Sequence, residues 1–280
     1  MRALPRLAPL LAALALLLAP AAHAQLAEGG ARVLALGRAG AALGGEAWGH
    51  ANPAAWAGLG ETRAALQASQ AFGLSELRLG ALSAALPTSL ATVAVHARTY
   101  GFSERRETRV LVGAARPLPL SVTRRLDVGL AVGVETASTE GYASHTALLV
   151  HAGVQGDVLP GLRAGLAARN LLGLGLDDTA DLRRSASTVP GVTVGVAYAP
   201  SDRATLVLDA DQDLDFGLSV RAGAEVVPVD ALALRAGVTT TPVRFTAGLG
   251  VRTGALRADL AVESHETLGL TPAVGLEIGL

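Results

Sequence analysis

Apolar and polar positions alternate one by one along most of this chain, most clearly from Leu218 to Val238. Leucine, valine and alanine alternate there with serine, arginine, glycine and glutamate on both sides of Val227-Pro228-Val229-Asp230. A period of two gives a strand one apolar face and one polar or small face. Proline fixes φ and offers no strand donor, so this tetrapeptide reads as a turn. The stretch predicts a β-hairpin.

The same alternation recurs to the last residue and predicts about fourteen strands after residue 60. Their typical length of 8–12 residues matches the roughly 9–11 residues that a tilted strand needs to cross a bilayer. The predicted strands are 63–69, 75–86, 89–100, 107–116, 126–136, 145–156, 162–170, 191–199, 204–212, 218–227, 231–238, 243–252, 256–263 and 268–280.

The predicted connections alternate in length. Short ones are 87–88, 158–161, 200–203, 228–230 and 253–255, while 171–190 is long. The connection 117–125 is assigned to the short set although it is longer than the others. Short turns on one rim and longer loops on the other are typical of an outer-membrane barrel.

The faces of the predicted strands favour the same class. Leu256 and Leu260, for example, lie opposite Arg257 and Asp259, and almost every strand keeps one continuous aliphatic face. A soluble β-sandwich also alternates, but its edge strands are usually polar on both faces. We therefore predict an all-β fold, a transmembrane antiparallel β-barrel of about 14 strands over residues 61–280. Aromatic residues make up only 3%, so the usual aromatic girdles are nearly missing.

The first residues predict export. Arg2 and Arg6 precede the apolar run 7–18, and Pro20-Ala21-Ala22-His23-Ala24 follows. This is a charged region, an apolar region and a small-residue cleavage site. An uncleaved anchor helix is the alternative, but the run is short. We expect residues 1–24 to be a cleaved signal peptide and the outer membrane to be the destination.

Composition removes several classes of function. The net charge of −1 gives no argument for nucleic acid, and the chain contains no cysteine that could form a disulfide, a thiolate metal site or a nucleophile. His96, His145, His151 and His265 are scattered, without the converging nucleophile, base and oxyanion donors that catalysis needs. We expect no enzyme activity and no cofactor.

Residues 25–60 do not follow the strand pattern. Alanine and glycine dominate, a short helix is predicted within residues 31–42, and Gly44-Gly45 ends it. Both tryptophans of the chain, Trp48 and Trp56, lie here. A segment so rich in small residues can pack inside a narrow space.

The residues of this segment resemble a known family. Gly30-Ala31-Arg32-x-x-Ala35-Leu36-Gly37-Arg38-Ala39-Gly40-Ala41-Ala42, followed by Trp48 and Asn52-Pro53-Ala54, resembles the N-terminal segment of the PorV/PorQ branch of FadL-like outer-membrane proteins. The stretches 162–173, 232–238 and 265–269 are similar too. The resemblance implies a fourteen-stranded barrel whose lumen holds residues 25–60 as a plug.

Four plug residues are the candidates for a role in this segment: Trp48, Asn52, Pro53 and Trp56. The Asn52 amide can bond to the backbone of the barrel wall while Pro53 fixes the turn. Such a contact holds a plug in place. The alternative is that the plug shifts to open a path.

Charged residues on the inward face form a second candidate site. They indicate either a polar conduit or a mutually neutralising network that fills the lumen. The candidates are Arg163, Arg169, Asp209, Asp211, Arg221, Glu225, Arg235, Arg244, Arg252, Arg257, Asp259 and Glu263.

Four aspartates alternate at the end of one predicted strand: Asp209, Asp211, Asp213 and Asp215. Carboxylate oxygens on one face can bind calcium. They lack the spacing and the glycine of a known calcium loop, so a solvated acidic rim is the favoured interpretation.

Two functions remain open. The resemblance favours an accessory of type IX secretion that holds secreted cargo and contacts secretion-system subunits. The alternative is a FadL-like transporter that passes a hydrophobic ligand across the outer membrane. In both cases, membrane lipids surround the barrel.

Overall fold

A computed structural model describes residues 29–49, 51–121, 125–142, 144–172, 174–175, 189–214 and 217–280. The expected signal peptide, 1–24, and Asp215 lie outside the described residues. None of the helices in these ranges is long and apolar enough to span a bilayer.

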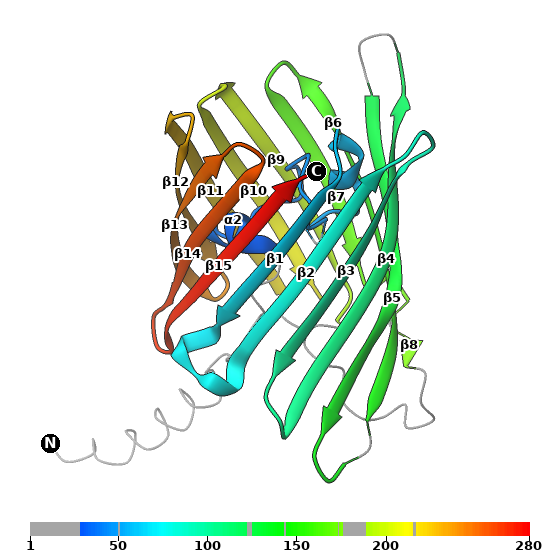
Figure 1. Ribbon diagram of the computed structural model, residues 1–280, viewed down its shortest axis with the longest axis vertical. Coiled ribbons are helices and arrows are strands. Elements are labelled where there is room, and N and C mark those ends of the chain that lie inside the picture. Colours follow the sequence, from blue (N-terminus) through cyan, green and yellow to red (C-terminus); the bar gives the residue numbers. More distant parts are fainter. Residues whose placement is uncertain are drawn as a thin grey trace, which may run out of the picture.

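The strands close into one antiparallel barrel (Figure 1). Each strand of the wall pairs with its neighbours in sequence, β1 pairs with β15, and the β5–β6 pairing completes the ring. Fourteen of the fifteen strands form the wall, and the two-residue β8 pairs with β6. The strands are β1 Arg63–Gln70, β2 Arg78–Pro87, β3 Thr92–Gly101, β4 Arg105–Pro119, β5 Arg125–Thr139, β6 His145–Leu159, β7 Leu162–Arg169, β8 Leu174–Gly175, β9 Gly191–Ser201, β10 Ala204–Asp213, β11 Gly217–Val229, β12 Leu232–Thr240, β13 Val243–Thr253, β14 Leu256–His265 and β15 Gly269–Gly279.

The predicted fourteen-stranded antiparallel barrel is confirmed, with differences at strand ends. The 3-10 turn η3 (Ser75–Leu77) occupies the predicted start of β2, and η2 (Ala71–Gly73) lies in the connection before it. β4 extends to Pro119, so the connection to β5 is shorter than predicted. β11 runs through Pro228 to Val229, with a register shift between Val226 and Val229. An irregularity accommodates the missing proline donor.

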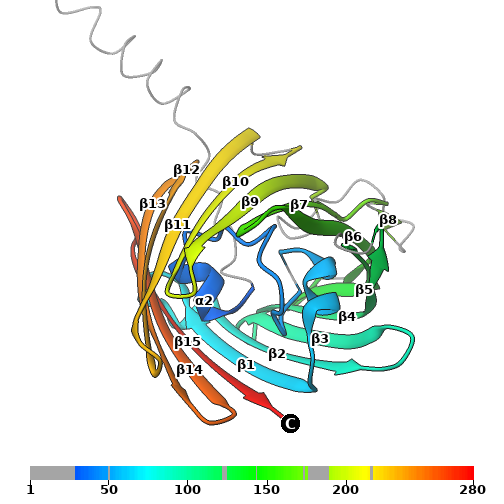
Figure 2. The same ribbon diagram turned by 90° about the horizontal axis from the view of Figure 1, so that it is seen from above.

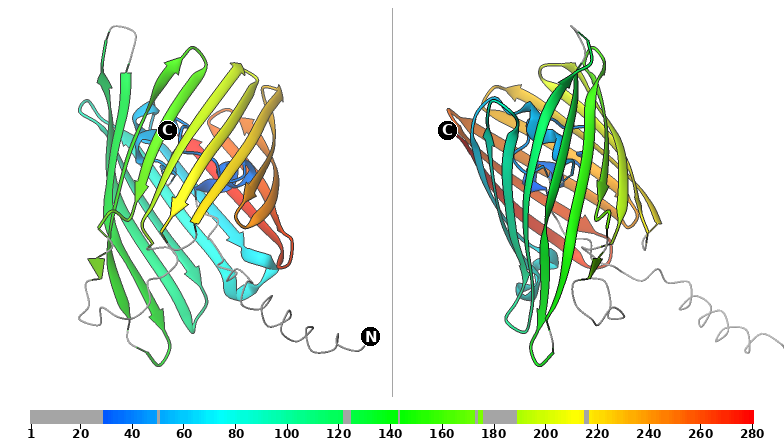
Figure 3. Two further views of the ribbon diagram at one scale, coloured as in Figure 1. Left: turned by 180° about the vertical axis from the view of Figure 1, so that it is seen from behind. Right: turned by 90° about the vertical axis from the view of Figure 1, so that its right-hand side faces the viewer.

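The two rims differ in their connections. β1 begins and β15 ends at one rim, where the links β6–β7, β9–β10, β11–β12 and β13–β14 are two residues each. We call it the short-turn rim. The opposite, long-loop rim carries residues 71–77 and the long connection between β7 and β9. Figure 3 shows the wall continuing around the barrel between these rims.

The two faces of the wall have opposite chemistry. Leu130, Leu234 and Leu276 point outward and are about half exposed, whereas Asp127 and Glu135 point inward and are fully buried. Charged groups on the inside and aliphatic groups outside reverse the order of a soluble protein. The exterior therefore suits an apolar surrounding medium, as the alternation predicted.

The described residues of 29–60 lie inside the barrel, and we call them the luminal segment (Figure 2). Its helix α2 (Gly30–Ala35) lies against β12–β15, and its 3-10 helix η1 (Pro53–Gly58) lies against β3–β6. α2 is shorter than predicted, because Gly37 and Arg38 both have positive φ and turn the chain.

Glycines in the wall make room for this segment. A Cβ on Gly223 would lie 2.4 Å from the Leu36 oxygen, and one on Gly237 would lie 2.2 Å from the Gly37 nitrogen. Backbone packs directly on backbone at these positions, which only glycine allows. The inward face of the wall is thus shaped to hold the luminal segment.

Candidate functional site

The helical part of the luminal segment is tied to the wall by buried ion pairs. Arg32 binds both carboxylate oxygens of Glu225, at 2.9 and 2.6 Å, and also pairs with Glu46 within the segment. Arg38 binds both oxygens of Glu263, at 2.7 and 2.8 Å. Bidentate arginine–carboxylate pairs fix the orientation of the two side chains as well as their distance.

Further wall residues join these pairs into a network. Arg235 lies 2.6 Å from Glu225 and 2.7 Å from Asp259, so it links β11, β12 and β14. Arg257 pairs with Asp259 at 3.0 Å and with Glu277 at 3.4 Å. The predicted inward charges Glu225, Arg235, Arg257, Asp259 and Glu263 are therefore brought together with residues of the luminal segment.

Glu46 is the acidic member of this network that the luminal segment supplies. Burial favours its neutral form, but the Arg32 and Arg257 guanidiniums outweigh this and hold the pKa of Glu46 below its ordinary value. Its carboxylate is therefore ionised at neutral pH, and both arginines share its negative charge.

The aspartates of β10 have separate tasks. One oxygen of Asp209 accepts hydrogen bonds from the Gly40 and Ala41 nitrogens, at 2.7 and 3.0 Å. Asp211 pairs with Arg169 at 2.7 Å and with Arg221 at 2.5 Å. Asp209, Asp211 and Asp213 are buried, so the favoured interpretation of a solvated acidic rim is wrong for these three. Within the described ranges, no three or more histidine, aspartate or glutamate side chains lie together as they would around a metal ion.

Two predicted members lie apart from the network. Arg163 pairs with Asp157 at 3.0 Å and approaches Asp127 at 3.7 Å, near the short-turn rim. Arg252 has the inward phase of β13 but is exposed, because it lies at the end of the strand.

Sequence reasoning missed several charged residues, among them Arg32, Arg38 and Glu46 of the luminal segment and a buried group on β3–β5. Glu135 on β5 accepts from Arg98 at 2.6 Å and from Arg109 at 2.9 Å, and all three are buried. Their inward phase in the alternating strands was the available signal. Their partners lie on neighbouring strands and follow only from the register.

Asn52 joins the luminal segment to the wall without charge. Its side-chain nitrogen donates to the Ala41 oxygen at 2.7 Å and to the Val154 oxygen of β6 at 3.1 Å. Its side-chain oxygen accepts from the Ala54 nitrogen at 3.0 Å and caps η1, with Pro53 as the first residue.

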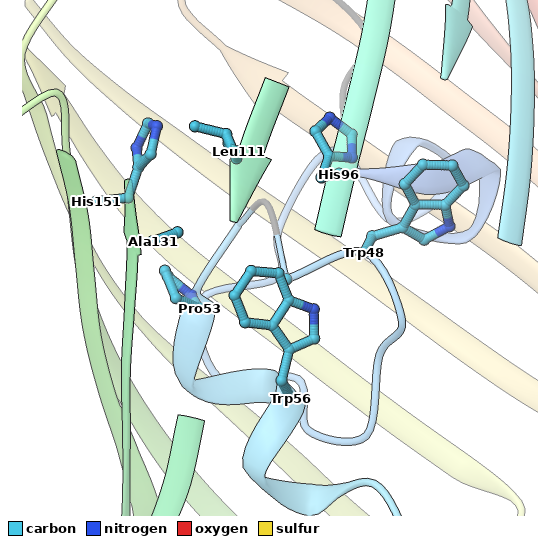
Figure 4. A pocket seen from close by; sticks show the side chains of 8 residues that line it. Trp48, Pro53, Trp56, His96, Leu111, Ala131 and His151 are labelled. Carbon is cyan, nitrogen blue, oxygen red and sulfur yellow. The ribbon is translucent and has the colours of Figure 1, made fainter. Parts of the chain in front are cut away.

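A pocket lies between η1 and the wall (Figure 4). Its lining combines apolar groups with two indoles and two imidazoles, around a cavity of about 10 Å³, which has room for about one water molecule. The lining residues are Trp48, Gly49, Pro53, Trp56, His96, Leu111, Ala131 and His151.

The pocket brings together residues from distant parts of the chain. His96 is paired with Leu111 across β3 and β4, and Ala131 with His151 across β5 and β6. The Trp48 and His96 rings meet edge to face, with centroids 5.8 Å apart. Two of the four scattered histidines, His96 and His151, are thus brought to one site by the fold of the wall. Aromatic walls with a few polar atoms suit a small, largely apolar ligand, which could enter only when these walls move apart.

No protein-family model matches this sequence, and no curated protein does. Solved structures are similar over nearly the whole chain. The CymD monoaromatic hydrocarbon channel has a TM-score of 0.67 at 11% identity, with 92% of this chain and 99% of that chain covered. The Ralstonia pickettii toluene transporter TbuX has a TM-score of 0.63 at 12% identity, covering 91% and 99%.

A Pseudomonas aeruginosa FadL homologue has a TM-score of 0.60 at 11% identity, covering 91% of this chain and 99% of its own. At such identities the likeness concerns the fold. The chain has the closed antiparallel barrel fold of FadL-like outer-membrane proteins.

Proposed function

We propose that this chain is an outer-membrane barrel that passes small hydrophobic molecules, with the luminal segment as its plug and the Trp48–Trp56 pocket as a binding site on the route. The apolar exterior supports the location, because a wall with outward leucines and valines needs lipid around it.

The pocket carries this proposal. It holds both tryptophans of the chain, and it lies inside the barrel where the luminal segment meets β3–β6. An apolar molecule that enters gains contact with indole faces and leaves water, which is favourable at about 25 cal/mol per Å² of apolar surface. The charged network lies on the α2 side of the lumen and offers no comparable apolar surface.

The structural comparisons favour the transporter hypothesis over the secretion accessory. CymD is called a hydrocarbon channel and TbuX a toluene transporter, and both share this fold. The accessory role rests on the resemblance of the N-terminal residues to PorV/PorQ proteins. No contact in the described part of the chain adds to it.

Tryptophan fluorescence tests the proposed function directly, since both emitting residues line the pocket. The detergent-solubilised barrel is titrated with toluene. We expect a saturable change of emission. Ala131→Val, which narrows the pocket, should weaken the change, whereas Ala114→Val on the exposed side of β4 should preserve it. A linear, unsaturable response in the unaltered chain would refute the pocket as a binding site.

A further inference from the structure

We infer that the luminal segment has an anchored part, residues 30–42, and a movable part, Asn52 with η1, which we call the η1 segment. Small molecules pass between the η1 segment and β3–β6 when the η1 segment moves, while the anchored part stays in place. This inference rests on the proposed function and adds the side of the lumen and the moving element.

The anchored part is held by charge and by backbone hydrogen bonds. Besides the Arg32–Glu225 and Arg38–Glu263 pairs, four of its backbone nitrogens are bound by wall side chains. The Gly30 nitrogen donates to Gln67, the Gly37 nitrogen to Thr246, and the Gly40 and Ala41 nitrogens to Asp209. Moving this part would leave buried charges without partners on several strands, which is strongly unfavourable.

The η1 segment is held differently. Its sequence, Asn-Pro-Ala-Ala-Trp-Ala-Gly, contains no charged side chain, so it cannot form a salt bridge. Trp56 and Ala57 pack in an apolar cluster with alanines of the wall. The Asn52 side-chain nitrogen donates to the Val154 and Leu166 oxygens of the wall and to the Ala41 oxygen of the anchored part. Lifting this segment exposes apolar surface and breaks these neutral hydrogen bonds, but it separates no buried ion pair. Its displacement is therefore the less costly movement.

Glycines at both ends allow the η1 segment to turn. Gly45 has φ of +70° and donates from its nitrogen to the Ala55 oxygen at 3.0 Å, and Gly49 has φ of +50°. Gly58 ends η1 and lies against Gly45. Glycine accepts large changes of backbone angle with little strain. The segment can change its angle without unfolding the anchored part.

The arrangement of the site indicates what such a movement would do. Looking down the barrel, α2 and η1 lie at opposite sides of the lumen (Figure 2). In the close view, Pro53 and Trp56 of η1 lie on one side of the pocket, and Leu111, Ala131 and His151 of the wall on the other (Figure 4). Displacing the η1 segment widens this pocket and extends it along β3–β6.

Two engineered disulfides test the division, because the natural chain has no cysteine. A Cβ on Gly153 lies 2.9 Å from the Asn52 Cγ, where a cysteine sulfur would sit, so Asn52→Cys with Gly153→Cys locks the η1 segment. The matched control is Ala31→Cys with Gly275→Cys, whose Cβ atoms lie 3.3 Å apart, close to the roughly 3.5–4.5 Å of a disulfide. That pair locks the anchored part.

The readout is toluene transfer into liposomes that contain the barrel, before and after reduction. We expect the oxidised η1 lock to lose transfer and to regain it on reduction, while the oxidised control lock transfers like the unaltered chain. Equal loss with both locks, or no loss with the η1 lock, overturns the inference. Absence of transfer in the unaltered chain would instead count against the proposed function.

Hydrogen exchange in the detergent-solubilised barrel tests the movement without any ligand. The Ala54 and Ala55 amides, bonded within the η1 segment, should exchange faster than those of Gly37 and Gly40, which are bonded to the wall. Equal or slower exchange in the η1 segment overturns the inference, whatever the transport result.

Discussion

Arg32 and Glu225 are separated by 193 positions in the sequence, yet Arg32 donates to both oxygens of that carboxylate. Both side chains are mostly buried, at 15% and 9% exposure, and Arg235 shares the same carboxylate at 2.6 Å. One arginine of the luminal segment and one of the wall therefore share the negative charge of Glu225. This carboxylate connects the luminal segment to the wall of the barrel.

Replacing this carboxylate should loosen the luminal segment. Glu225→Gln keeps the shape but leaves two buried guanidiniums with less negative charge, and loss of one partner of a buried pair costs about 3–5 kcal/mol. We expect a lower unfolding temperature of the barrel, measured by heat-dependent gel mobility, and a higher conductance in planar bilayers.

The control for Glu225→Gln is Asp230→Asn. Asp230 pairs with Arg203 at 3.5 Å, and both side chains are largely exposed, so little stability should change. Equal shifts in the two variants would contradict the anchoring role of Glu225.

A wall glycine gives the second prediction. A Cβ on Gly237 would lie 2.2 Å from the Gly37 nitrogen, and a backbone atom cannot move aside as a flexible side chain can. Gly237→Ala should push the luminal segment away, at about 1–3 kcal/mol of overpacking, and raise bilayer conductance. Gly80→Ala is the matched control, because its nearest neighbour would be at 3.8 Å. Unchanged conductance in Gly237→Ala would show that the segment does not pack there in the membrane.

The outward face gives the third prediction. Leu234 is about half exposed on β12, and Leu234→Arg should hinder assembly in the membrane by about 2–4 kcal/mol near the bilayer midplane. Val229→Arg, at the strand end, should cost about 0–1 kcal/mol. Assembly is measured by folding into lipid vesicles. Normal assembly of Leu234→Arg would argue against a lipid-facing wall.

Removal of the plug gives the fourth prediction. A chain without residues 25–60 should still form the barrel, because the wall strands pair with one another around the full ring. It should conduct ions more readily, since the lumen loses the segment that fills it. Planar-bilayer recording measures this, and conductance equal to that of the full chain would refute the plug role.

The strands of the barrel can largely be predicted from the local sequence pattern. Alternation with a period of two is a property of neighbouring residues, so the strand around Leu256 and Asp259 can be recognised without knowing its partners. The ends of the strands do not follow from this pattern, because β-propensity does not decide where the hydrogen-bonded pairing of two strands stops. Residues 75–77 form a turn although they alternate like the strand that follows.

The candidate site was recognised only in part. Trp48, Asn52, Pro53 and Trp56 were marked by residue type, but nothing local indicates that His96 and His151 complete their pocket. The aspartates of β10 were recognised as a group, while their burial depends on the segment that covers them.

The sequence by itself determined the period of the strands, the apolar outer face and the small-residue N-terminal segment, because these depend on residue type and spacing. The tertiary structure alone decided that Arg32 meets Glu225, that Asp209 binds the Gly40 nitrogen, and which wall glycines face the luminal segment. Such contacts depend on strand register and on closure of the ring, which bring distant residues within hydrogen-bond distance.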